Sequence, residues 1–370
     1  MKDNGFFQNC QSSDPSLQWP TVSRESSGVT ADKPYCPPHS RKQQQFLLGE
    51  LLRDVSRSFY LTLRVLPVQI RPQISLAYLL ARASDTIADT QVMPRAKRVA
   101  LLREMQPLAR VPDLGGLVER QTLPAEKRLL ERLGDCFDTL GRFDEADGRR
   151  IQELLQVIIT GQIFDLEKFP GETEQELVAL ANDDELDRYT YMVAGCVGRF
   201  WTRMCAAHLK ELESWNVGAM EELGVRFGKG LQLVNVLRDI PKDLRIGRCY
   251  LPVKDPRPLL DPSHYDSIRP DYTRWLDRAV EHLDAGWQYT MEIPSRLWRL
   301  RLACIWPIWI GLKTIARLRT ANPLDPQKRV QISRGEVYAI MLRSFLAVRN
   351  GAKLNALFQR LRGAAAISGR

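Results

Sequence analysis

Apolar residues recur at intervals of three and four positions through most of this 370-residue chain, beginning near Phe46. That period is typical of amphipathic helices, and the alternation of half-buried strands is nearly absent. The sequence therefore predicts an all-α protein. The expected helical segments are 46–55, 74–89, 95–109, 126–141, 148–168, 174–208, 218–239, 270–292, 295–319 and 334–361.

The helical pattern defines one large domain at 45–362, since none of its Pro- and Gly-containing breaks resembles a flexible linker. Residues 1–44 are rich in Ser, Gln, Pro and Asp and are expected to be a mobile tail, and 363–370 a short C-terminal tail. The apolar run Leu302–Leu312 is too short to span a membrane and contains Pro307. We expect it to be a buried core helix.

The composition limits the cellular location, the kind of metal ligand and the partners that we expect. Seven cysteines without a CxxC pair, and no apolar core near the N-terminus, predict a reducing, cytoplasmic location without a secretory signal. Only four histidines make zinc improbable, so a metal would be held by oxygen. From Arg301 onward, thirteen Lys and Arg face two acids, a net charge of +11. This segment is a solvated basic face, a peripheral contact with the anionic lipid of the inner membrane surface, or an attractor of a diphosphate substrate, and nucleic acid is not expected as a partner.

Two polar stripes carry the predicted chemistry. The first lies on one helical face and consists of Tyr78, Arg82, Asp85 and Asp89. The second consists of Gln232, Asn235, Asp239 and Asp243. Either DxxxD pair alone is most simply an exposed acidic pair, but two stripes on facing helices could hold Mg²⁺ and a diphosphate. Pro241 should kink or end the second helix, and Arg238, off the stripe, meets an anion or makes a structural pair.

Two further segments support this site. Gly195 and Gly198 interrupt a helical pattern at a cost of about 1 kcal/mol each relative to Ala, so either a helix packs closely there or a substrate needs the space. Tyr189, upstream, could move a proton or stabilise a cation, or could be a core residue. Arg57, between two serines, could bind phosphate.

Together these segments resemble the squalene/phytoene synthase family. The matching motifs are SRSF, YxxxRxxDTIAD, YxYxVAGxVG and QxxNxLRDxxxDxxxGRxYLP, in that order up to residue 252, and VQISRGEV at 330–337. The resemblance implies an isoprenoid synthase fold with a central cavity. It implies Mg²⁺ ligands at Asp85, Asp89, Asn235, Asp239 and Asp243. It implies diphosphate contacts from Arg57, Tyr78, Arg82, Gln232 and Arg238, and catalysis by Tyr189 with Asp85 and Asp239.

The chain departs from the family pattern at several positions. Many relatives carry glutamate where this chain has Ala88 and Lys242. Either the site has fewer direct metal ligands and Lys242 meets phosphate itself, or both side chains face away from the site, which the helical phase favours. In the C-terminal segment that the resemblance connects with NADPH, two positions that are basic in the eukaryotic form are Gln331 and Ser333, while Arg334 is retained.

The resemblance implies a Mg²⁺-dependent prenyltransferase that joins two farnesyl diphosphates head to head through presqualene diphosphate, and reduces the product to squalene with NADPH. Phytoene, dehydrosqualene or presqualene diphosphate are alternative products of the same chemistry, because the sequence does not set the cavity depth that selects C15 or C20 tails. A non-catalytic helical protein that binds membranes through its basic C-terminal region is the alternative of another class. The sequence does not indicate an oligomeric state.

Overall fold

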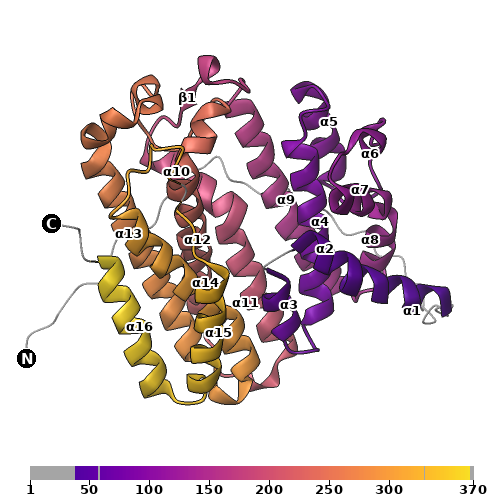
Figure 1. Ribbon diagram of the computed structural model, residues 1–370. Helices are drawn as coiled ribbons and strands as arrows, with labels where there is room; N and C mark the ends of the chain where they lie inside the picture. Colours follow the sequence, from indigo (N-terminus) through magenta and orange to yellow (C-terminus); the bar gives the residue numbers. More distant parts are fainter. Residues whose placement is uncertain (1–37, 57–58, 329, 367–370) are drawn as a thin grey trace, which may run out of the picture. The chain divides into compact units, whose positions relative to one another are not determined.

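The computed structural model describes residues 38–56, 59–328 and 330–366, and all of these except Pro38 belong to one compact unit, His39–Arg370 (Figure 1). This unit is almost entirely helical, which confirms the all-α prediction. Residues 1–37 and 367–370 of the two expected tails, and Arg57, lie outside the described residues. The domain limits of 45–362 remain a prediction.

The α-helices are α1 (Pro38–Gln45), α2 (Leu52–Ser56), α3 (Tyr60–Val65), α4 (Arg71–Asp89), α5 (Arg95–Met105), α6 (Leu117–Arg120), α7 (Pro124–Glu131), α8 (Leu133–Leu140), α9 (Glu145–Lys168), α10 (Asp183–Thr190), α11 (Cys196–His208), α12 (Val217–Arg245), α13 (Tyr265–Glu292), α14 (Trp298–Leu318), α15 (Arg334–Ala347) and α16 (Gly351–Ala366). Single π-helical turns span Phe46–Leu51 and Tyr191–Gly195. The 3₁₀ turns are Glu174–Glu176, Lys210–Leu212, Arg257–Leu260, Pro262–His264 and Ser295–Leu297.

The core consists of two clusters of buried apolar side chains. One includes residues of α4, α8 and α9, and the other includes residues of α12, α13 and α14. Helix α12 packs against α11, α13 and α14, and α4 packs against α9 (Figure 1). The run Leu302–Leu312 lies within α14 and is buried almost throughout, as predicted. No described helix combines the length and the apolar character needed to cross a bilayer.

The glycines of the third motif let two helices approach closely. A Cβ added at Gly198 would overlap the backbone carbonyl of Gly224 on α12, and one at Gly195 would lie 3.3 Å from the Lys229 side chain. Close packing between α11 and α12 therefore accounts for Gly198. The alternative, that this glycine makes room for substrate, is not needed.

Helix α12 does not end at Pro241 but continues to Arg245. A proline removes the N–H that would bind the carbonyl four residues earlier, here that of Leu237. The hydroxyl of Tyr272 on α13 donates to this carbonyl at 3.2 Å. The neighbouring helix thus satisfies the group that the proline leaves unpaired, and the acidic stripe extends without a break.

The segment 174–208, expected to be helical, is interrupted. It contains a 3₁₀ turn, the short strand β1 (Val178–Ala179), α10, a π-helical turn and α11. Strand β1 pairs in parallel with β2 (Arg248–Cys249), through Val178 N to Gly247 O at 3.1 Å and Leu180 N to Cys249 O at 3.0 Å. Apolar spacing alone did not reveal this pairing, which fixes the chain just after α12.

Candidate active site

A pocket of about 270 Å³ lies where the two core clusters meet. Its lining comes from α4, α9, the α10–α11 segment, α12 and β2, and consists of Asp85, Ala88, Asp89, Gly161, Gln162, Asp165, Leu166, Tyr189, Val193, Gln232 and Arg248. Among the described residues, this lining has three carboxylates and one arginine. The pocket is therefore predominantly polar and acidic, and Ala88, Leu166 and Val193 add apolar groups to its lining.

Asp85 is held in place by a glutamine from α9. Gln162 Nε2 donates to Asp85 Oδ1 at 2.6 Å and to Ser84 Oγ at 3.1 Å. Burial raises the pKa of Asp85 to about 6, and the nearby charge of Asp89 adds to this rise. Asp89, one turn further, is exposed at the pocket wall. The two predicted carboxylates of α4 therefore line one pocket.

A second part of the lining is a polar network around the buried Asp165. Asp165 Oδ2 pairs with Arg248 Nη1 at 2.7 Å, and the hydroxyl of Tyr250 donates to Asp165 Oδ1 at 2.6 Å. The ring of Tyr189 stacks on that of Tyr250 with centroids 4.7 Å apart. Burial raises the pKa of Tyr189 well above its ordinary value, so the phenol stays protonated at neutral pH.

The local sequence explains how Arg248 reaches this wall. Gly247 adopts a positive φ of 81°, and a Cβ there would lie 3.0 Å from the Thr173 carbonyl oxygen. Only glycine fits this tight turn without strain. The turn leads directly into β2, and its pairing with β1 directs Arg248 toward Asp165.

Sequence reasoning did not select Gln162, Asp165 or Arg248 as site residues. Gln162 and Asp165 are polar residues one turn apart within an otherwise apolar face of α9, which is a detectable signal. Arg248 stands in the GRxYLP part of the fourth motif. Its partner Asp165 lies 83 positions earlier (248 minus 165), so spacing could not connect them.

The second stripe is only partly in the pocket. Gln232 lines it, and Asn235 lies exposed one turn on, with its Nδ2 3.5 Å from Gln232 Oε1. Asp239 is held by the adjacent Arg238 through two hydrogen bonds of 2.9 and 2.6 Å. Arg238 therefore makes the structural pair that the sequence left open.

Asp243 lies one turn beyond Asp239 and lines a second, smaller pocket together with Arg248. Burial raises the pKa of Asp243 to about 7, and the charge of Asp239 adds to this rise. Because Arg248 lines both pockets, it connects the carboxylates of α4 with the end of α12.

The remaining predicted residues lie outside the main pocket lining. Arg82 pairs with Glu126 at 2.5 Å, and Tyr78 stacks on Phe59 with centroids 5.3 Å apart. Ala88 lines the pocket, so the expectation that it faces away from the site is wrong. The phase argument failed because Ala88 lies only about 60° around the helix from Asp85, within the arc of α4 that lines the pocket. Lys242 is exposed.

The pocket residues fit a hard divalent cation. Their donors are carboxylate and amide oxygens, which Mg²⁺ prefers. Gln162 Oε1 is buried and accepts no hydrogen bond from the described residues. A separate group of potential ligands, Asp144, Asp147 and His208, already has internal partners, since Asp147 pairs with His208 and Arg150 at 2.8 Å.

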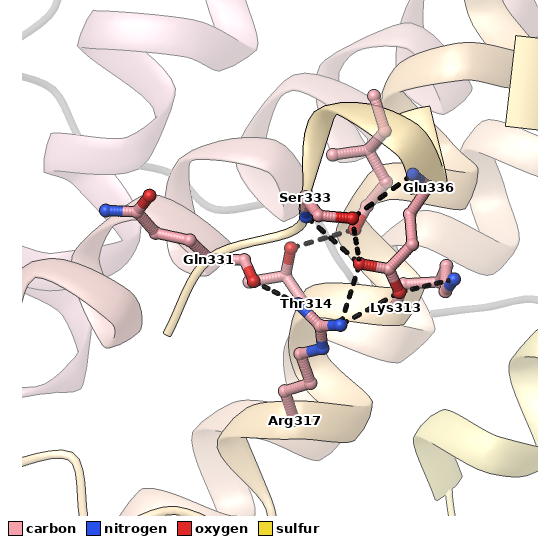
Figure 2. Close-up of polar contacts among 7 residues, drawn as sticks. Lys313, Thr314, Arg317, Gln331, Ser333 and Glu336 are labelled. Atoms are coloured by element: carbon pink, nitrogen blue, oxygen red, sulfur yellow. Dashed lines mark hydrogen bonds and ion pairs between the residues drawn. The ribbon is translucent and has the colours of Figure 1, made fainter. Parts of the chain in front are cut away.

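The VQISRGEV segment forms the start of α15 (Figure 2). The Ser333 and Glu336 side chains form a capping box, and Glu336 also binds Lys313 at 2.9 Å and Arg317 at 2.8 Å. These contacts hold the pKa of Glu336 down at about 2. Lys313 and Arg317 are thus engaged by Glu336, and the exposed Arg334 is the residue of this segment that would meet an NADPH phosphate.

Comparison with known proteins establishes the family. Residues 52–336 match the squalene/phytoene synthase family model. The presqualene diphosphate synthase of Rhodopseudomonas palustris is 29% identical over 250 residues, 65% of this chain and 76% of that protein. The squalene synthase of Ganoderma lucidum is 31% identical over 205 residues, 55% of this chain and 42% of that protein. A phytoene synthase of Arthrospira platensis is 25% identical over 281 residues, 74% of this chain and 82% of that protein.

Solved structures agree in fold. TcSQS, a squalene synthase in complex with the ligand E5700, superposes with a TM-score of 0.66 at 19% identity, covering 88% of this chain and 97% of that one. A dehydrosqualene synthase superposes with a TM-score of 0.53 at 17% identity, covering 84% and 98%. The chain is thus an all-α protein of the isoprenoid synthase fold. It belongs to the squalene/phytoene synthase family, a family of prenyltransferase-like enzymes that act on prenyl diphosphates.

Proposed function

We propose that this enzyme condenses two prenyl diphosphates head to head in the pocket between α4, α9 and α12. Farnesyl diphosphate is the proposed substrate, presqualene diphosphate the intermediate, and squalene the final product when NADPH is supplied. Mg²⁺ is the proposed metal. The support for the reductive half is the sequence of the VQISRGEV segment alone.

The observation that carries the proposal is the charge of the pocket lining, three carboxylates against one arginine among the described residues. A free diphosphate is strongly anionic, and like charges in an enclosed site repel one another strongly. Such a lining accepts a diphosphate only together with divalent cations. Asp85, Asp89 and Gln162 are the proposed ligands on α4 and α9, and Asn235, Asp239 and Asp243 those on α12.

When bound, Mg²⁺ would neutralise the diphosphate and stabilise it as a leaving group. On the protein side, Gln162 orients Asp85, and Arg248 contacts the anion from the Asp165 wall. With cations bound at Asp239, Arg238 would exchange this carboxylate for the diphosphate as the partner of its two donors. Tyr189 presents its ring to the carbocation, and its protonated hydroxyl lies beside Tyr250, through which a proton can reach Asp165.

The product is tested by incubating the purified enzyme with farnesyl or geranylgeranyl diphosphate, with and without NADPH, and identifying the hydrocarbons by mass spectrometry. The proposal expects squalene from farnesyl diphosphate with NADPH and presqualene diphosphate without it. Phytoene from the C20 substrate, or dehydrosqualene regardless of NADPH, would assign one of the alternative products instead.

The proposed location is the cytoplasm, with peripheral attachment to the inner membrane surface. The alternative of another class is a non-catalytic helical protein of the membrane surface. Such a protein would bind vesicles but would not release diphosphate from either substrate. Diphosphate release that needs Mg²⁺ and is lost in Asp85→Ala excludes it.

A further inference from the structure

Helix α15 exposes a continuous apolar stripe. Tyr338, Leu342, Phe345 and Leu346 are each between 56% and 67% exposed and follow one another at helical spacing. Its opposite face is buried against α14, where Trp306 Nε1 donates to Ser344 Oγ at 2.9 Å. The inner face is therefore fixed by packing, and the outer face is held toward solvent.

The charges around this stripe have one sign. Arg334 begins α15 and Arg349 follows its end, both exposed, and Arg343 lies exposed at the flank of the stripe. Glu336, the single acid of α15, is engaged by Lys313 and Arg317 of α14 (Figure 2). Its negative charge is therefore compensated within the fold and does not offset the arginines.

The stripe continues onto the start of α14. The ring of Phe345 lies edge-on to Trp298 with centroids 5.9 Å apart, and the guanidinium groups of Arg349 and Arg299 lie 5.9 and 5.3 Å from the Trp298 ring. Arg299 is exposed. An aromatic side chain flanked by arginines is the arrangement that suits the boundary between lipid headgroups and acyl chains.

A second group of cations adjoins this end. Burial lowers the pKa of the Arg71 guanidinium, and the nearby positive charges of Arg299 and Arg64 lower it further. Helix α3, which carries Arg64, packs against α14 and exposes Leu61 beside it. The surface formed by α15, the start of α14 and α3, which we term the α15 face, thus combines apolar side chains with arginines that form no ion pair with any acid in the described part of the chain.

We propose that the α15 face docks on an anionic lipid bilayer, with the apolar stripe in the headgroup layer and the arginines on lipid phosphates. Charge complementarity selects this occupant, because a second copy of the chain would bring the same arginines against one another. The inference deepens the proposed peripheral attachment by naming the surface that makes it, and it is separate from the proposed reaction because none of its residues lines the pocket.

The test is co-sedimentation of the full chain with sucrose-loaded vesicles of phosphatidylcholine, with or without phosphatidylglycerol. We expect binding to the anionic vesicles and little to the neutral ones. Leu346→Gln should lower the partition coefficient about tenfold. The matched control is Leu123→Gln, which changes an apolar residue 47% exposed before α7, and it should bind like the unaltered protein.

The role of positive charge is tested with Arg343→Gln, which should lower vesicle binding about fivefold. Its matched control is Arg142→Gln, an exposed arginine in the turn between α8 and α9, which should not lower binding. Because Leu346 and Arg343 are exposed, both variants should keep the melting temperature of the unaltered protein. Asp85→Ala should lose diphosphate release and keep vesicle binding, which separates this inference from the proposed function. Equal binding by Leu346→Gln and the unaltered protein would overturn it, as would a dimer that Leu346→Gln dissociates without any effect of vesicles.

Discussion

Arg248 and Asp165 form an ion pair of 2.7 Å between Nη1 and Oδ2 that joins β2, just after α12, to the last turn of α9. Tyr250, two residues after Arg248, donates to the other oxygen of the same carboxylate at 2.6 Å. Both oxygens of a buried acid are therefore bound by one short segment. This contact places a cation between the two acidic stripes.

Arg248→Ala should lower the free energy of unfolding by about 3 kcal/mol, because it leaves the buried Asp165 carboxylate without its cation. Urea denaturation measures this loss. The double variant Arg248→Ala/Asp165→Asn should be more stable than Arg248→Ala alone. Arg245→Ala, an exposed arginine three residues earlier, is the control and should cost little. If the two arginine variants unfold at the same urea concentration, the pair has no structural role.

Tyr272→Phe should cost about 1–3 kcal/mol, since it removes the donor to the Leu237 carbonyl opposite Pro241. In the background Pro241→Ala, the new backbone N–H can bind that carbonyl, and the same substitution should cost much less. Thermal or urea unfolding of the unaltered protein, the two single variants and the double variant gives the coupling free energy between Tyr272 and Pro241. If the two substitutions change the free energy of unfolding additively, Tyr272 does not compensate for the proline in α12. Tyr265→Phe, at the start of the same helix, is the control.

Gly198→Ala should destabilise the protein by about 3 kcal/mol, because the added methyl group meets the backbone of Gly224 on the neighbouring helix. Gly148→Ala is matched in chemistry but has no atom within 4 Å of the new methyl group. It should stabilise α9 by about 0.5–1 kcal/mol. Equal effects of the two substitutions, measured by calorimetry, would show that close packing does not explain the third motif.

The pKa values of Asp85, about 6, and Asp243, about 7, are raised by burial above the value of an unfolded aspartate. Between about pH 4 and 7 the folded metal-free protein therefore binds more protons than the unfolded chain, and its stability falls as the pH rises. Asp85→Asn should then raise the melting temperature of the metal-free protein at pH 8 by about 2 °C or more, and change it little at pH 4.

Magnesium should reverse that effect. The ions compete with protons for the same carboxylates, so Mg²⁺ should stabilise the unaltered protein increasingly from pH 5 to pH 8. It should do so much less for Asp85→Asn. Asp138→Asn, an exposed acid of α8, is the control. Stabilisation by Mg²⁺ that does not depend on pH would place the metal elsewhere.

The sequence predicted the helical class, the buried helix at Leu302–Leu312 and the residues Asp85, Asp89, Tyr189 and Gln232 that share one pocket. These follow from periodicity and short motifs, which record local neighbours. Asp165 was not selected as a site residue because its role depends on Arg248, which the pairing of two short strands brings close to it. Asp239 is held by Arg238, a choice between partners that spacing does not decide. Long-range pairing and competition between partners account for what the sequence left open.

The central claim is that the pocket binds diphosphate only together with divalent cations. The most direct measurement is isothermal titration calorimetry of inorganic pyrophosphate into the full chain, with Mg²⁺ and with EDTA, using the unaltered protein, Asp89→Asn and Asp138→Asn. The account predicts binding in Mg²⁺ and none in EDTA, with loss of binding in Asp89→Asn but not in Asp138→Asn. Equal binding with and without Mg²⁺, or full binding by Asp89→Asn, would contradict it.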